Sequence, residues 1–262
     1  MRILITGSKG YIASYLFEAI KKQNYKSPVS IFRIDKKISP SLDLNSNECQ
    51  KEIRIFNPDL VYHLAAQTSV DKSFKNPDQD IQDNLFATLN LLKCLNKKAK
   101  IIFTSSAAIY GDNTNANEED VLRPQSPYAI HKVAAEKYII NSGLEYVILR
   151  LGNVYGRENN KGVFKALKAG GVIFGDGNNT RDYIYIDDVV NALIKAPGFY
   201  VNQIYNVGTG ISTSVNEIAD MLKIEKRYGP TQKEQKRLRL DISKIIKEGW
   251  RYSIQLNDKL NE

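Results

Sequence analysis

The chain opens with Met1-Arg2-Ile3-Leu4-Ile5-Thr6-Gly7-Ser8-Lys9-Gly10-Tyr11-Ile12-Ala13, and this stretch decides the fold. Its first part is a short apolar run rich in β-branched residues, which predicts a buried strand. Two glycines follow, with Ala13 at the third small position, and an amphipathic helical pattern begins after them. Glycine lets the backbone turn tightly, and the free N–H groups at a helix start point toward an anion. The order of strand, glycine turn and helix predicts a pyrophosphate site, although ordinary strand–helix turns share that order.

Length and composition are those of one large domain, or of a domain that carries a smaller lobe. The chain has 262 residues, 42% of them hydrophobic, and no apolar stretch approaches the length of a membrane span. The N-terminal apolar run is too short for a signal peptide. Cys49 and Cys94 are the only cysteines and favour a reducing, cytoplasmic location. His63 and His131 are the only histidines, so a histidine-rich metal site is excluded and no metal is expected.

The formal net charge is +8, and lysine dominates it. A basic balance can favour an anionic ligand, a nucleic acid or a membrane surface. The lysines are dispersed, and no nucleic-acid-binding motif occurs. We therefore attribute the positive charge to lysines on a solvated surface. We expect the protein to bind neither a nucleic acid nor a membrane.

Strand-like and helical patterns alternate along the chain. We expect strands near 2–6, 29–34, 59–63, 100–104, 146–151 and 203–207, and helices near 11–22, 47–56, 80–97, 127–141 and 187–195. This alternation predicts an α/β fold, a Rossmann-type doubly wound parallel sheet with helices on both faces. Ligands bind at the carboxyl ends of such strands, so the residues just past each strand should carry the function.

Asp35 directly follows the second expected strand, 25 positions after Gly10. A carboxylate there accepts hydrogen bonds from the adenosine ribose of a dinucleotide and repels a 2′-phosphate, which favours NAD over NADP. Lys36 and Lys37 oppose that choice, because a basic residue can hold the additional phosphate. A surface aspartate at a strand end is the alternative, and the fingerprint spacing favours the ribose role.

The third strand is followed by His63-Leu64-Ala65-Ala66-Gln67, whose two small residues would let a cofactor lie against the backbone. The helix expected at 80–97 includes Asn84 and repeats leucine at 85, 89, 91, 92 and 95. We assign that leucine stripe to core or subunit packing.

The fourth strand ends in Ser105-Ser106-Ala107-Ala108-Ile109-Tyr110-Gly111, where hydroxyl groups can bind a sugar oxygen or cap a loop. Tyr128 and Lys132, behind Pro127, are four positions apart and would share one helix face. A phenol titrates near ~10, and one ammonium at ~4 Å in a dielectric of ~20 supplies ~4 kcal/mol, enough to lower that pKa by ~3 units. Such a phenol would be a base near neutral pH. A chance pair on an exposed face is the alternative, and the upstream motifs favour chemistry.

Taken together, these stretches resemble the extended short-chain dehydrogenase/reductases of the NAD-dependent epimerase/dehydratase family, and within it UDP-glucose 4-epimerases most closely. The resemblance covers nearly the whole chain in the family's order. It rests on the stretches 6–12, 63–67, 105–111, 128–132, 149–156, 174–177, 180–188 and 205–210.

The resemblance implies a role for each matching residue. Tyr128 would be the catalytic acid and base at the sugar C4 hydroxyl, Ser106 would hydrogen-bond the same oxygen, and Lys132 would hold the nicotinamide ribose and lower the pKa of Tyr128. Asn153 and Arg181, with Tyr183 beside them, would hold the diphosphate of a nucleotide sugar, for which a guanidinium is well suited. Besides Tyr128 and Lys132, the residues implied to bind NAD are Gly7, Gly10, Tyr11, Ile12, Asp35, Lys36, Asp43, Leu44, Leu64, Ala65, Ala66, Gln67, Asn84 and Gly152.

The activity implied by the resemblance is an NAD-dependent epimerisation at C4 of a UDP-sugar of the glucose/galactose type, through a 4-keto intermediate. Ala107 and Ala108 stand where dehydratases carry acidic residues, so elimination of water is not expected. A nucleotide-sugar 4-reductase or dehydrogenase, and a non-catalytic NAD-sensing protein on the same fold, are the alternatives. Relatives commonly pair through the helices matching 80–97 and 127–141, so a homodimer is expected.

The expected division is an NAD-binding Rossmann domain at 1–151 and 182–210 and a small substrate-binding lobe at 152–181 and 211–262. The lobe departs from the family in Gly229-Pro230-Thr231-Gln232-Lys233-Glu234, where Thr231 replaces an arginine. The chain is also short between Gly156 and Gly175 and beyond Trp250. We therefore expect weakened diphosphate binding and an open substrate pocket.

Overall fold

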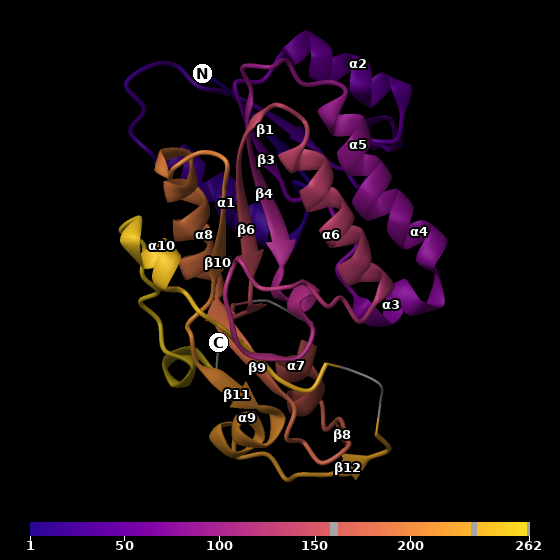
Figure 1. Ribbon diagram of the computed structural model, residues 1–262, viewed down its shortest axis with the longest axis vertical. Coiled ribbons are helices and arrows are strands. Elements are labelled where there is room, and N and C mark those ends of the chain that lie inside the picture. Colours follow the sequence, from indigo (N-terminus) through magenta and orange to yellow (C-terminus); the bar gives the residue numbers. More distant parts are fainter. Residues whose placement is uncertain (158–161, 232–234, 261–262) are drawn as a thin grey trace.

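A six-stranded parallel sheet forms the centre of the computed structural model, which describes residues 1–157, 162–231 and 235–260 (Figure 1). Its strand order is β10-β6-β4-β3-β1-β2. The chain runs outward from β1 to β2 and then returns to β3 on the other side of β1, so the order reverses between β1 and β3. A ligand site is expected at that reversal. The strands are β1 (Arg2–Thr6), β2 (Ser30–Ile34), β3 (Leu60–His63), β4 (Lys100–Ser106), β6 (Glu145–Leu151) and β10 (Gln203–Val207).

Helices cover both faces of this sheet, as Figure 1 shows. Ile3 and Ile5 of β1 face one layer, and Leu4 between them faces the other, because side chains alternate along a strand. One layer contains α1 (Tyr11–Lys21) and α8 (Ile186–Lys195). The opposite layer contains α2 (Asn47–Phe56), α5 (Ala87–Leu92) and α6 (Pro127–Ile140). Burial on both sides explains the uninterrupted apolar runs of the strands, and the expected doubly wound fold is confirmed.

The helix expected at 80–97 is interrupted and shifted. It is preceded by α3 (Val70–Lys75), begins as α4 (Pro77–Ile81), passes through a π-helical turn η2 (Gln82–Phe86) and ends as α5. The wider turn carries Asp83 and Asn84. Single π-helical turns inside α-helices are often associated with functional sites.

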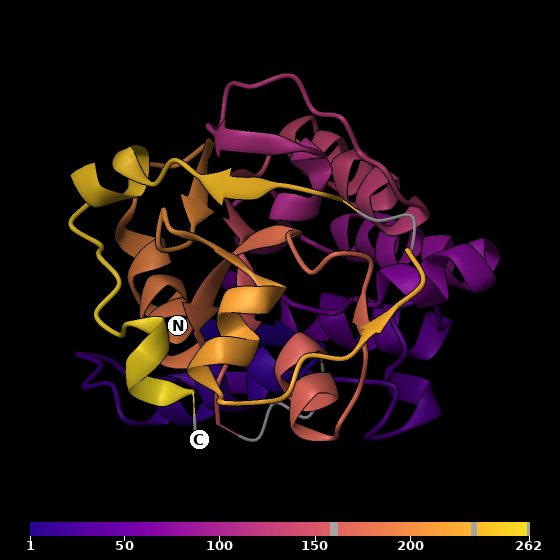
Figure 2. The same cartoon turned by 90° about the horizontal axis from the view of Figure 1, so that it is seen from below.

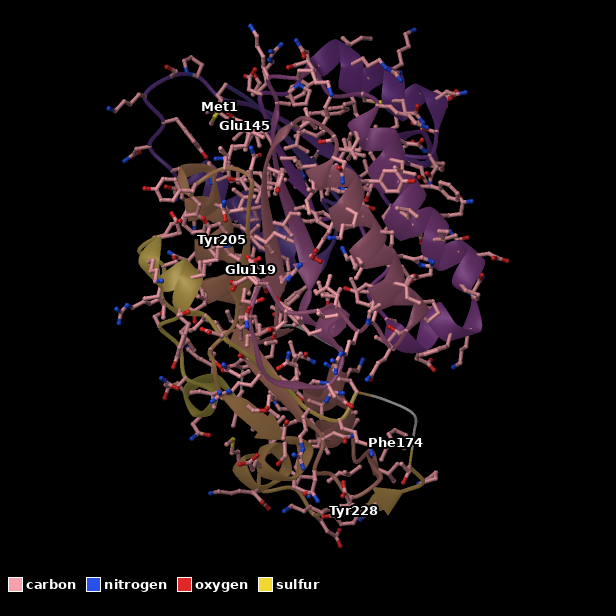
Figure 3. The ribbon with its side chains drawn as sticks, viewed as in Figure 1. Met1, Glu119, Glu145, Phe174, Tyr205 and Tyr228 are labelled. Atoms are coloured by element: carbon pink, nitrogen blue, oxygen red, sulfur yellow. The ribbon has the colours of Figure 1, made fainter. Side chains whose placement is uncertain are left out.

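Smaller sheets lie beyond the carboxyl ends of the central strands. One contains β7 (Asn153–Tyr155), β9 (Thr180–Tyr185) and β11 (Ser212–Ser214). Figure 2 shows β13 (Leu238–Leu240, yellow) beside β5 (Asn113–Ala116, magenta). The third pairs β8 (Ile173–Phe174) with β12 (Tyr228–Gly229), and Figure 3 shows Phe174 and Tyr228 at the end of the molecule farthest from Met1. The remaining helices are α7 (Gly162–Lys168), α9 (Val215–Met221), α10 (Ser243–Lys247), η1 (Pro40–Leu42), η3 (Ala107–Tyr110), η4 (Ala196–Gly198) and η5 (Leu256–Lys259).

These outer elements have a core of their own, built largely from aromatic side chains. Tyr155 stacks on Phe164 and meets Tyr185 edge to face, while Phe164 meets Tyr183 edge to face. In the part of the chain that the structure describes, no helix is both long enough and apolar enough to cross a membrane.

Candidate active site

The glycine turn lies against the loop that follows β3. Gly7 has a φ of +64°, and a Cβ added to it would lie 2.6 Å from the Cα of Ala65. A Cβ on Gly10 would lie 2.9 Å from the carbonyl oxygen of Gly7. Only glycine fits these positions, and Gly10 caps α1 without a side-chain hydrogen bond. The first N–H groups of α1 are therefore available to an anion at the point where the strand order reverses.

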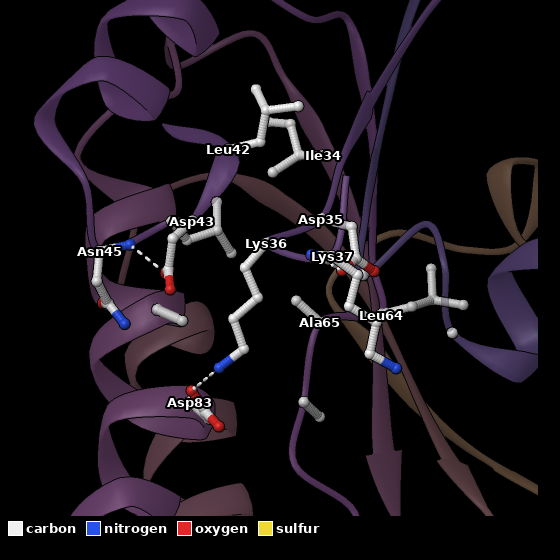
Figure 4. Close-up of a pocket in the computed structure, with 15 residues that line it drawn as sticks. Ile34, Asp35, Lys36, Lys37, Leu42, Asp43, Asn45, Leu64, Ala65 and Asp83 are labelled. Atoms are coloured by element: carbon white, nitrogen blue, oxygen red, sulfur yellow. Dashed lines mark hydrogen bonds and ion pairs between the residues drawn. The ribbon is translucent and has the colours of Figure 1, made fainter. Parts of the chain in front are cut away.

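A pocket opens beside this turn, between the ends of β1, β2 and β3 and the turn η2 (Figure 4). Nine of the residues predicted to bind NAD line it, namely Gly7, Gly10, Asp35, Lys36, Asp43, Leu44, Leu64, Ala65 and Ala66. Lys37, which the sequence analysis considered together with Lys36 as a ligand of an additional phosphate, lines the pocket too, and the lining residues that sequence reasoning missed are Ile34, Leu42, Asn45, Asp83 and Ala87. Most of these missed residues flank predicted ones, so their position in the chain was the only signal available.

Asp35 joins the glycine turn to the end of β2. Its Oδ2 accepts a hydrogen bond from the backbone N–H of Lys9 at 2.8 Å, and its Oδ1 accepts one from the N–H of Lys37 at 2.8 Å. A carboxylate offers about four acceptor positions, so each oxygen keeps one for a ribose hydroxyl. The Lys36 side chain turns away from Asp35 and meets Asp83 at 2.7 Å.

Asn84 presents an acceptor without a partner. Its Nδ2 donates to Oδ1 of Asp80 at 3.0 Å, whereas its own Oδ1 is buried and has no hydrogen-bond partner within residues 1–157, 162–231 and 235–260. A buried polar oxygen without a partner is costly, so the position indicates a ligand that donates to it. Together with the glycine cradle and the free carboxylate positions of Asp35, this orphan oxygen fits a bound dinucleotide.

Other residues predicted to bind NAD lie outside this pocket. Gln67 donates to Ser69 and Asp80, and the Tyr11 hydroxyl donates to the Gly156 carbonyl at 2.6 Å. Ile12 packs against the two cores that flank α1. A Cβ on Gly152 would lie 2.8 Å from the carbonyl oxygen of Asp182, so packing alone demands glycine there.

The predicted catalytic residues come together at the carboxyl end of β4, the strand next to β3. Ser106 is the last residue of β4, and its hydroxyl is close enough to the phenol of Tyr128 to lower the pKa of that phenol. Tyr128 lies in the first turn of α6, which Ser126 caps. Lys132, one turn later, donates from Nζ to the carbonyl oxygen of Thr104 at 2.8 Å.

The electrostatics of this cluster differ from expectation. Burial raises the pKa of Tyr128 to about 12, and the nearby Ser106 hydroxyl offsets only part of that rise. Burial also lowers the pKa of Lys132 to about 8. The predicted lowering of the Tyr128 pKa by Lys132 is thus not found in this arrangement, because desolvation of a phenolate dominates and the ammonium is held by Thr104.

A buried carboxylate that sequence reasoning missed supports this cluster. Asp80 accepts from Gln67 and Asn84 through Oδ1, and its Oδ2 lies 2.6 Å from Nδ1 of His131. His131 belongs to α6 and directly precedes Lys132, so Asp80 joins α4, η2 and the first two turns of α6. Its position four residues before Asn84, one helical turn, was the signal that could have found it.

The residues predicted to bind the diphosphate lie on the small three-stranded sheet. Asn153 pairs with Tyr183 in the parallel register of β7 and β9. Arg181 lies two positions before Tyr183 on β9, hence on the same face, and donates to the Thr180 carbonyl at 2.9 Å. Tyr183 is buried among the aromatic residues of the lobe. Thr231 lies near Gly175, while 232–234 of the stretch that departs from the family are outside the described residues.

Comparison with known proteins agrees with this geometry. Residues 3–208 match the model of the NAD dependent epimerase/dehydratase family. The chain belongs to this family. The UDP-glucose 4-epimerase of Mycolicibacterium smegmatis is 33% identical, with 83% of this chain and 80% of that protein covered.

Two solved structures extend the likeness to nearly the whole chain. The UDP-glucose 4-epimerase of Thermotoga maritima, solved with UDP-glucose, is 33% identical with a TM-score of 0.85, and the match covers 99% of this chain and 96% of that one. The enzyme of the same name from Thermus thermophilus, solved with NAD, is 30% identical with a TM-score of 0.83 and the same coverage.

Proposed function

We propose that the protein is an NAD-dependent nucleotide-sugar 4-epimerase that acts on a UDP-sugar of the glucose/galactose type. The observation that carries the proposal is the meeting of Ser106, Tyr128 and Lys132 at the end of β4, one strand from the loop that lines the dinucleotide pocket. The similarity to UDP-glucose 4-epimerases, one of them solved with UDP-glucose and another with NAD, supports the cofactor and the sugar nucleotide.

The glycine turn and Asp35 would hold the pyrophosphate and the adenosine ribose, and Asn84 would accept a hydrogen bond at the nicotinamide end. When bound, the dinucleotide supplies a hydride acceptor and donor and, in its oxidised form, a positive ring charge that favours the phenolate of Tyr128.

Tyr128 would take the proton of the C4 hydroxyl and later return it to the same oxygen, with Ser106 donating a hydrogen bond to that oxygen. The C4 centre would pass through a 4-keto sugar, which must turn over before it is reduced on the opposite face. Because the pKa of Tyr128 is about 12 in its buried site, the phenol needs nearby positive charge to act near neutral pH.

Ala107 and Ala108 directly follow Ser106 and offer no acid or base to the sugar. Elimination of water needs both, so this loop favours epimerisation over dehydration. The sugar diphosphate would lie toward the lobe formed by 152–181 and 211–262, where we assign its binding to Asn153, Arg181 and Tyr183.

A homodimer and a cytosolic location complete the proposal. Exposed apolar side chains lie on η2 and α6, among them Phe86 (40% exposed), Ile130 (51%) and Tyr138 (51%). These helices pack on one another along one side of the sheet, as in Figure 1, and a second copy would cover them. The free thiols of Cys49 and Cys94 support a reducing compartment.

Product identification tests the proposal. Purified protein with a trace of NAD⁺ is incubated with UDP-glucose, and proton NMR should reveal the galactose epimer while the absorbance near about 340 nm stays flat. Stoichiometric loss or gain of that absorbance would indicate a reductase or dehydrogenase. Absence of turnover on a panel of UDP-, dTDP- and GDP-sugars would contradict the proposal.

A further inference from the structure

Lys36 and Asp83 face each other across the dinucleotide pocket. Lys36 directly follows Asp35 after β2, and Asp83 belongs to the π-helical turn η2, 47 positions later. Lys36 Nζ donates to Asp83 Oδ1 at 2.7 Å. Figure 4 shows the lysine side chain extended across the pocket to this carboxylate.

Asp83 is the fixed member of the pair. Its side chain is 17% exposed, against 50% for Lys36, and its Oδ1 also accepts from Nε2 of Gln79 at 3.1 Å. Asn45, which also lines the pocket, donates to the carbonyl of Gln82 in the same turn at 3.3 Å. The carboxylate is therefore anchored, and the more exposed lysine extends to meet it.

This arrangement changes what the sequence around Asp35 can select. A lysine directly after the ribose-binding aspartate is a natural ligand for a 2′-phosphate, since phosphate oxygens attract ammonium groups. Here Asp83 engages that ammonium and offsets its charge, so Asp35 is the carboxylate that keeps its negative charge toward the ribose. A phosphorylated ribose thereby loses its cationic partner, whereas an unphosphorylated ribose needs none.

We propose that Asp83 is a second determinant of cofactor choice, which holds Lys36 away from the ribose and so denies the 2′-phosphate of NADP a cationic partner. This inference rests on the proposed function, because it assigns the adenosine ribose to the pocket that Asp35 and Asp83 line. It predicts that the preference for NAD depends on a residue far in sequence from the strand end where such preference is usually sought.

Calorimetric titration of the purified protein with NAD⁺ and NADP⁺ tests this inference. Asp83→Asn keeps the shape and the acceptor for Gln79 but frees Lys36, so it should tighten NADP⁺ binding about tenfold relative to NAD⁺. Adding Lys36→Met to the Asp83→Asn variant should abolish the gain in NADP⁺ affinity. Adding Lys51→Met instead, at an exposed lysine of α2 outside the pocket lining, is the matched control and should preserve the gain. The single variant Lys36→Met should change NADP⁺ affinity less than about threefold, because the lysine is already engaged.

An unchanged ratio of NADP⁺ to NAD⁺ affinity in a folded Asp83→Asn variant would overturn the inference, and so would a gain that survives Lys36→Met. If Asp83→Asn does not fold, a loss of more than tenfold in NADP⁺ affinity in Lys36→Met would overturn it instead. In each of these outcomes the unaltered protein still binds NAD⁺, so the proposed function would stand. A protein that binds neither dinucleotide would overturn the proposed function, and this inference with it.

Discussion

The ammonium of Lys132 donates a hydrogen bond to the carbonyl oxygen of Thr104 at 2.8 Å, which ties the catalytic face of α6 to the end of β4. The same Nζ lies 4.5 Å from the centre of the Phe103 ring. Lys132 is buried, so its charge depends on these two contacts and on the neighbouring acidic residues Asp80 and Glu136. The lysine thus ties the helix that carries Tyr128 to β4 and contributes the local positive charge.

Lys132→Met should remove that charge and the link to Thr104 while it preserves the side-chain volume. We expect epimerase turnover to fall by at least about 10²-fold, the range expected when the group that supports an acid–base residue is lost. Turnover and circular dichroism would be measured together. Lys137→Met, on the exposed side of the same helix, is the control and should leave both unchanged. A Lys132→Met enzyme with turnover near that of the control would refute the role of the ammonium.

Gly7→Ala should disrupt both the fold and the binding of the cofactor. The new Cβ would lie 2.6 Å from backbone atoms of Ala65, in a conformation with φ of +64°. We expect a loss of at least about 2 kcal/mol in the free energy of unfolding, together with loss of NAD⁺ binding. Gly198→Ala meets no atom within 4 Å and serves as the control for denaturant unfolding and for calorimetry. Equal stability of the two variants would show that the turn is less tight than described.

His63 should make the stability of the protein sensitive to acid. Its ring lies between the hydroxyls of Thr6 (2.7 Å) and Thr88 (2.9 Å), and burial lowers its pKa from 6.5 to about 3. The Thr88 hydroxyl already donates its hydrogen to the Asn84 carbonyl, so it must accept the hydrogen bond from Nε2–H of His63. The neutral His63 ring then accepts a hydrogen bond from the Thr6 hydroxyl at Nδ1.

The unfolded chain takes up a proton at His63 below pH 6.5, whereas the folded chain does so only near pH 3, so stability falls as pH falls through that window. Between pH 7 and pH 5 this residue should cost about 2 kcal/mol. Urea unfolding of the wild type and of His63→Asn at both pH values isolates this contribution, because all other titrating groups are shared. An equal pH dependence in the two proteins would rule it out.

A negative charge on the outer face of α6 should separate the proposed dimer. Ile130→Glu places a carboxylate where a second copy would bury an apolar side chain, which is strongly unfavourable. Analytical ultracentrifugation should show a dimer for the wild type and a monomer for the variant. Tyr200→Glu, at a side chain that is 78% exposed after η4, is the control and should remain dimeric. A wild type that sediments as a monomer would contradict the homodimer.

The core of this architecture could be predicted because its signals are local. The glycine turn, Asp35, and the Tyr128–Lys132 spacing each lie within one strand–loop–helix unit, and the structure places them at one edge of the sheet. For Asp80 the only local signal is its spacing from Asn84, and its partners Gln67 and His131 come from separate elements that no local pattern connects. Nor does any pattern in 82–86 signal a π-helical turn.

The pKa of Tyr128 shows a different limit of sequence reasoning. Spacing correctly places a lysine on the face of the phenol, but it says nothing of the burial that dominates the pKa or of the carbonyl that holds the ammonium. The strands of the outer lobe are also very short, two residues each in β8 and β12, so no periodicity could reveal them.

The turnover of Tyr128→Phe tests the central claim most directly. The variant keeps the ring that fills the buried site and loses only the hydroxyl that meets Ser106. Conversion of UDP-glucose, followed by proton NMR with NAD⁺ affinity measured in parallel, should fall by about 10³-fold or more while the cofactor still binds. Turnover within tenfold of the wild type would contradict the assignment of Tyr128 as the group that moves the C4 hydroxyl proton.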